Sequence, residues 1–124
     1  MIWTFAAAAA LSLLTLGVHL FLGGPGVARP VLAARELDPV AKYTSYYCWH
    51  LVSMVIAAMT AAYVRAALEP HARDLAILVT ALAAGFAVWS LALAVWKRQR
   101  IMVLPQWILF LPIAVLGVVG LVME

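Results

Sequence analysis

Four long apolar stretches are the feature that most constrains how this 124-residue chain can fold. A helix rises 1.5 Å per residue, so crossing about 30 Å of hydrocarbon takes roughly 20 apolar residues. The stretches cover residues 2–22, 40–64, 75–96 and 101–122. Backbone amides inside a bilayer must be hydrogen-bonded within their own segment, so each stretch predicts a transmembrane helix. We therefore predict an all-α integral membrane protein with a single four-helix transmembrane domain over residues 1–124.

Composition excludes several other classes of protein. Hydrophobic residues make up 68% of the chain and charged residues 10%, whereas soluble domains are about 45–50% apolar and about 25% charged. A water-soluble globule, a disordered tail and a nucleic-acid-binding module are therefore excluded. Cys48 is the single cysteine, so an internal disulfide is excluded as well. The first basic residue is Arg29, and we therefore expect no cleavable signal peptide.

The segments between the spans predict the arrangement of the helices. The first span is expected to end at Gly23-Gly24-Pro25-Gly26, because such a cluster does not continue a helix. Residues 30–37 are expected to form a short helix along the membrane surface. The second and third loops are short, which favours antiparallel neighbours in an up-down bundle.

Basic residues are distributed unevenly between the two predicted membrane surfaces. One surface holds Arg29, Arg35, Lys42, Lys97, Arg98 and Arg100, and the other holds Arg65 and Arg73. Loops rich in Lys and Arg stay on the cytoplasmic side, so both termini are predicted on the outer, periplasmic side of a bacterial cytoplasmic (inner) membrane. Lys97, Arg98, Arg100, Arg29 and Arg35 are expected to set this topology or to bind anionic lipid headgroups.

Each span carries small or polar residues at helical spacing, and these stripes are predicted to face the inside of the bundle. They comprise Ala8, Ser12, Thr15 and His19; Tyr43, Tyr46, His50, Ser53, Ala57 and Thr60; Thr80, Ala84, Ala87, Ser90 and Ala94; and Gln106, Phe110, Ile113, Gly117 and Gly120. Tyr63 is expected near the outer interface, where an amphipathic ring is favoured.

His19 and His50 stand out, because ionisable residues inside a span are costly and often functional. Counted from the inner ends of their spans, they lie about 5 Å and about 10 Å deep. Tyr46, Trp49 and Gln106 are expected around them as a candidate cofactor-binding group. The simplest interpretation is a pair of neutral imidazoles that hydrogen-bond to neighbouring side chains or carbonyls and fix the register of two helices.

A second interpretation is bis-histidine ligation of haem b between the first two spans. Arg29, Arg35 or Lys42 would then meet the propionates at the interface. The difference of about 5 Å in depth between the two imidazoles is unfavourable for axial ligands of one iron.

A third interpretation is a metal site formed by His19, His50 and Cys48. Soft sulfur ligands favour Cu(I) over zinc. Cys48 and His50 are two residues apart and point about 200° away from each other on a helix, which is poor geometry for one ion.

The function that these features favour is a non-catalytic accessory or scaffold subunit of a larger membrane assembly. The sequence holds no catalytic triad order, paired carboxylates or nucleotide fingerprint, so nothing in it supports an enzymatic activity. Its expected partners are membrane lipids and other membrane subunits or further copies of itself, and no nucleic acid. Two alternatives stay open: a redox protein that binds haem b, a metal or a quinone-like molecule, and a small-solute transporter that works as a homodimer.

Overall fold

The computed structural model describes residues 1–123, which form helices joined by short connections and no strand. In chain order the elements are α1 (Trp3–Val18), the π-helix η1 (His19–Ala28), α2 (Arg29–Ala33), α3 (Pro39–Leu68), the 3₁₀ turn η2 (Pro70–Ala72), α4 (Arg73–Trp96) and α5 (Gln106–Met123). The helical stretches long and apolar enough to cross a membrane number four: Trp3–Ala33, Pro39–Leu68, Pro70–Trp96 and Gln106–Met123. The prediction of an all-helical chain with four candidate spans is confirmed.

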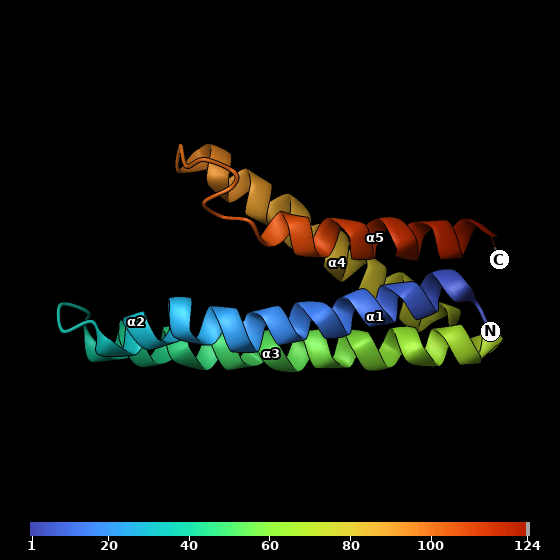
Figure 1. The fold of residues 1–124 in the computed structure, drawn as a ribbon, viewed down its shortest axis with the longest axis horizontal. Coiled ribbons are helices and arrows are strands. Elements are labelled where there is room, and N and C mark those ends of the chain that lie inside the picture. The colour runs from blue at the N-terminus through green and yellow to red at the C-terminus, as the bar shows by residue number, and fades with distance from the viewer. Residues whose placement is uncertain (124) are drawn as a thin grey trace.

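Successive long helices run in opposite directions, and the two termini lie at the same end of the molecule (Figure 1). α1 packs along both α3 and α5, while α4 packs mainly along α5 and less along α3. The α4–α5 hairpin diverges from the α1–α3 pair toward the end that holds α2 and the α4–α5 loop (Figure 1). α1 and α5 therefore each pack extensively on two other long helices.

Two glycines of α5 pack very closely against neighbouring helices. A Cβ atom at Gly117 would lie 2.6 Å from the Tyr63 hydroxyl oxygen and 2.8 Å from Cγ2 of Thr80. A Cβ atom at Gly120 would lie 2.7 Å from Cδ1 of the Phe5 ring. Small residues let membrane helices approach each other closely, and their association depends on van der Waals packing. These glycines therefore set the spacing of α5 from the rest of the bundle.

The first helix does not end at residues 23–26, contrary to the sequence-based expectation. The chain winds through Gly23, Gly24, Pro25 and Gly26 as the π-helix η1 and continues directly into α2. The backbone N–H of Arg29 donates to the carbonyl of Gly24, five residues earlier. This wider turn keeps the segment helical although Pro25 has no N–H to donate. A continuous helix is favourable in a bilayer, because few of its backbone groups lack a hydrogen-bond partner.

The prediction of a separate surface helix over residues 30–37 was also wrong, because the first helix continues into this segment. α2 is the last turn of the first helical rod and ends at Ala33, and residues 34–38 form the turn into α3. Asp38 caps α3 by accepting a hydrogen bond of 2.9 Å from the backbone N–H of Val40. An aspartate at this position satisfies one of the free amides at the start of a helix.

The predicted inward faces are correct for most residues of all four spans, with exceptions in the second and fourth. The stripes of α1, α4 and α5 are buried or half-buried except at Gln106, which is exposed. On α3, Tyr43 and Ala57 are exposed and the other four predicted residues are half-buried, while Ile56 and Met59 are more deeply buried. Tyr63 was expected at the outer interface but is 0% exposed. Its hydroxyl lies 2.9 Å from Thr80 Oγ1, so the phenol is hydrogen-bonded inside the bundle and not at the membrane surface.

Candidate functional site

His19 connects the first two spans directly. It lies where α1 passes into η1, and its Nε2 atom is 3.0 Å from Ser53 Oγ and 3.2 Å from the carbonyl oxygen of Trp49, both on α3. The Ser53 hydroxyl also donates to the Trp49 carbonyl at 3.2 Å. The three polar groups therefore form one small hydrogen-bonded unit between the helices. This arrangement is one of the side-chain and carbonyl contacts considered from the sequence.

Aromatic rings surround this unit. The imidazole of His19 stacks on the indole of Trp49 with 4.4 Å between centroids and 20° between planes. His50 meets the same indole edge to face at 5.1 Å and meets Tyr46 at 4.6 Å. Positions 46, 49, 50 and 53 share one face of α3 because they are three or four residues apart. We call His19, Tyr46, Trp49, His50 and Ser53 the imidazole cluster.

Gln106 and Cys48, which were also singled out from the sequence, are not part of this cluster. Gln106 begins α5, is exposed, and its Oε1 accepts from Ser90 Oγ of α4 at 3.4 Å. Cys48 is exposed on α3. The structure thus brings His19, Tyr46, Trp49 and His50 together, while Gln106 belongs to the α4–α5 contact.

The cluster does not have the composition of a metal centre. Within residues 1–123, no three His, Cys, Asp or Glu side chains come close enough to hold an ion. His19 Nε2, the nitrogen nearest α3, is already hydrogen-bonded to Ser53. Imidazole and sulfur ligands therefore do not converge here.

The geometry does not suit haem either. Axial ligation requires a nitrogen of each imidazole to be directed at an iron between them. His19 Nε2 is instead directed at α3, and the indole of Trp49 lies against both imidazoles. A porphyrin between His19 and His50 would have to displace that indole, so these residues do not fit the group in this arrangement.

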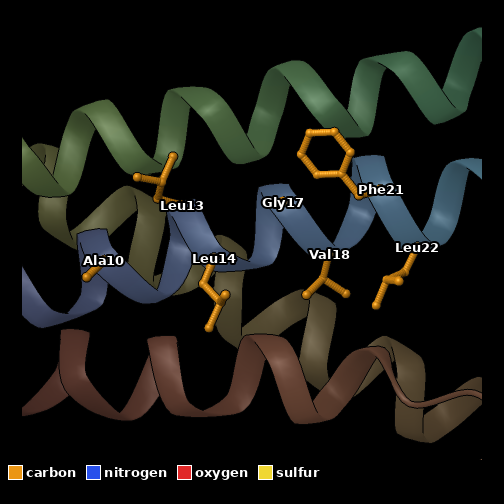
Figure 2. Close-up of a pocket in the computed structure, with 7 residues that line it drawn as sticks. All are labelled: Ala10, Leu13, Leu14, Gly17, Val18, Phe21 and Leu22. Atoms are coloured by element: carbon orange, nitrogen blue, oxygen red, sulfur yellow. The ribbon is translucent and has the colours of Figure 1, made fainter.

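Two shallow cavities flank the first rod on either side of Phe21. One has a volume of about 600 Å³ and is lined entirely by α1 and the first turn of η1 (Figure 2). The other, of about 240 Å³, lies beside the imidazole cluster between η1, α2 and α3, and Arg29, Tyr46 and Trp49 are among its lining residues. The second cavity is the more polar of the two, because a guanidinium and an indole border it.

Sequence reasoning missed two features of the interior. Gly23 and Gly24 lie against Trp49, with Cβ positions 3.8 Å and 3.9 Å from indole atoms, so the glycine cluster packs on the imidazole cluster. Tyr63 and Thr80 also form a buried polar pair beside Gly117. Neither contact has a local signature, because each joins residues from different helices.

The fold is an all-helical bundle with four candidate spans and an imidazole–indole contact between the first two. Comparison with protein-family models, with curated proteins and with solved structures finds no match to this chain.

Proposed function

We propose that this protein is a non-catalytic accessory or scaffold subunit of a larger assembly in a bacterial cytoplasmic membrane. The observation that supports this proposal most is the hydrogen bonding of His19. Its Nε2 atom binds Ser53 Oγ and the Trp49 carbonyl and thereby ties α1 to α3. A ring nitrogen used in this way serves helix association, and membrane hydrogen bonds of about 0.6–2 kcal/mol suffice to retain it.

Three further polar side chains form hydrogen bonds between the spans. Tyr63 pairs with Thr80 across α3 and α4 at 2.9 Å. Ser90 of α4 donates to the carbonyl of Leu104, and the backbone N–H of Trp107 donates to the Ser90 hydroxyl, at 3.2 Å each. Such interhelical bonds position helices, and they favour a structural role over a proton or ion pathway.

The outer face of α3 supplies a surface for a partner helix. Ala57, Ala58 and Ala61 are exposed in the middle of this helix. A membrane helix approaches most closely where its neighbour carries such small side chains four residues apart. We propose that a helix of another subunit, or of a second copy, packs here.

The proposed orientation has both termini in the periplasm. α2, the turn after it and the α4–α5 loop lie at one end, and the two termini lie at the other (Figure 1). The first end carries six of the eight Lys and Arg residues of the chain. By the positive-inside rule, this end faces the cytoplasm.

Extraction of the native protein in mild detergent, followed by native mass measurement, tests the proposal. We expect the protein to leave the membrane with a second chain attached. Ala61→Leu should release that chain, because a bulky side chain blocks close approach. Ala81→Leu is the matched control, since Ala81 is an exposed alanine on α4. A monomer without partners would refute the proposal, and a haem absorbance band in the purified protein would favour the redox alternative instead.

A further inference from the structure

A groove runs along the outside of the first rod, where no other helix covers it. Its cavity of about 600 Å³ lies between a ridge formed by Leu13 and Phe21 and a ridge formed by Leu14, Val18 and Leu22 (Figure 2). Ala10 and Gly17 line the space between the ridges. A Cβ atom at Gly17 would meet no protein atom within 4 Å, so its side of the helix is open.

A second cavity on the other side of Phe21 borders a cation. This cavity of about 240 Å³ shares Phe21 with the groove and extends past Gly24 and Pro25 to Arg29. Twelve residues separate Gly17 from Arg29, which at 1.5 Å per residue is at most about 18 Å. One leaflet of hydrocarbon is about 15 Å thick, half of the roughly 30 Å core. The two cavities together extend over about the thickness of one lipid leaflet and end at a positive charge.

The charge at the end of the second cavity is available to a ligand. Within residues 1–123, the guanidinium of Arg29 takes part in no hydrogen bond or ion pair, and this residue is exposed. A guanidinium binds phosphate oxygens through two parallel hydrogen bonds. The indole of Trp49 and the phenol of Tyr46 line the same cavity and are side chains favoured at headgroup level.

We propose that this groove binds an anionic phospholipid, with the headgroup phosphate on Arg29 and one acyl chain along α1 over Gly17. Charge complementarity favours this occupant, because six of the eight basic residues lie at the Arg29 end and attract anionic lipid. The walls are apolar side chains that match an acyl chain over its length. The proposal is independent of the accessory-subunit function.

Native mass spectrometry of the detergent-solubilised full chain, titrated with phosphatidylglycerol or with phosphatidylcholine of the same acyl chains, tests the proposal. We expect one phosphatidylglycerol to stay bound and phosphatidylcholine to bind about fivefold to tenfold more weakly, as one basic residue near the headgroup implies. Arg29→Gln should abolish this difference. Arg35→Gln is the matched control, because it removes the same charge from the exposed turn after α2.

A second pair of variants tests the acyl-chain part of the site. Gly17→Leu places a side chain in the groove, its Cβ meeting no protein atom within 4 Å, and should reduce phosphatidylglycerol binding about tenfold. Gly85→Leu should leave binding unchanged, because Gly85 has the same open surroundings on α4. Folding of both variants is checked by their helical circular dichroism.

Four outcomes would overturn the proposal. Equal losses in Arg29→Gln and Arg35→Gln would mean a general attraction to the basic end. Equal binding by Gly17→Leu and Gly85→Leu would mean that no chain occupies the groove. A dimer mass that Gly17→Leu abolishes, with lipid binding unchanged, would identify the groove as a contact between protein chains. If soluble glycerol phosphate displaced bound phosphatidylglycerol as strongly as free lipid does, the site would bind phosphate alone and no acyl chain.

Discussion

Gly117 lies where three helices meet, so adding a single methyl group there tests the packing directly. In Gly117→Ala, the new Cβ would lie 2.6 Å from the Tyr63 hydroxyl and 2.8 Å from Thr80 Cγ2, and closer still to Thr80 Oγ1. All of these distances are shorter than real Cβ contacts. Either α5 moves outward or the pair of Tyr63 and Thr80 separates.

The magnitude follows from the two costs involved. Overpacking a close-packed interior costs about 1–3 kcal/mol. Loss of the Tyr63–Thr80 hydrogen bond costs about 0.6–2 kcal/mol inside a membrane protein. We expect Gly117→Ala to lower the free energy of unfolding by about 1–4 kcal/mol, after a gain of about 1 kcal/mol from the better helix propensity of alanine.

The assay is reversible unfolding in mixed micelles of mild detergent and dodecyl sulfate, followed by circular dichroism. Gly85→Ala is the matched control, because a Cβ there meets nothing within 4 Å. Thr80→Ala removes two of the three atoms that the new methyl group would strike, so the double variant should lose at least about 1 kcal/mol less than the sum of the single losses. A Gly117→Ala protein as stable as Gly85→Ala, or strictly additive losses, would refute the reasoning.

Three further predictions use the same unfolding measurement. Gly120→Ala should lower the free energy of unfolding by about 1–3 kcal/mol, because its Cβ would enter an aromatic ring of α1. Ser53→Ala should cost about 0.6–1.7 kcal/mol through loss of its contact with His19, whereas Ser45→Ala, whose hydroxyl bonds only to its own helix, should cost less than half as much. Arg98→Gly should raise stability by about 1 kcal/mol, because Arg98 has a φ of 53° after the end of α4 and glycine adopts that conformation without strain.

Each of these predictions has a contrary outcome. A Gly120→Ala protein with wild-type stability would mean that α5 does not approach α1 as closely as described. Equal effects of the two serine variants would mean that the hydroxyl of Ser53 contributes nothing between helices. A destabilised Arg98→Gly protein would mean that the arginine side chain matters more than its backbone.

The long apolar runs were sufficient to predict the four helices, because hydrocarbon leaves a backbone segment no other common way to satisfy its amides. The boundaries were less predictable. The glycine–proline segment at residues 23–26 has the composition of a helix end in water, yet it continues as a π-helix packed on Trp49. A local composition rule contains no information about the helix that lies beside it.

The candidate site was predictable only in part. Spacing along α3 placed Tyr46, Trp49 and His50 on one face, and chain adjacency placed His19 opposite them. Gln106 had a matching depth but belongs to the α4–α5 contact. Depth in a membrane is a single coordinate, and it does not specify which neighbour a helix faces.

The sequence by itself determined that the chain is helical, that it holds four candidate spans and that its basic residues gather at one end, because these properties depend on hydropathy and charge along the chain. Only the tertiary structure decided that His19 bonds to α3, that Tyr63 is buried against Thr80 and that Gly117 and Gly120 set the position of α5. Those contacts depend on how each helix is rotated about its axis, and in a lipid environment that rotation is set by the shape and hydrogen bonds of the neighbouring helices, not by a difference in polarity between faces.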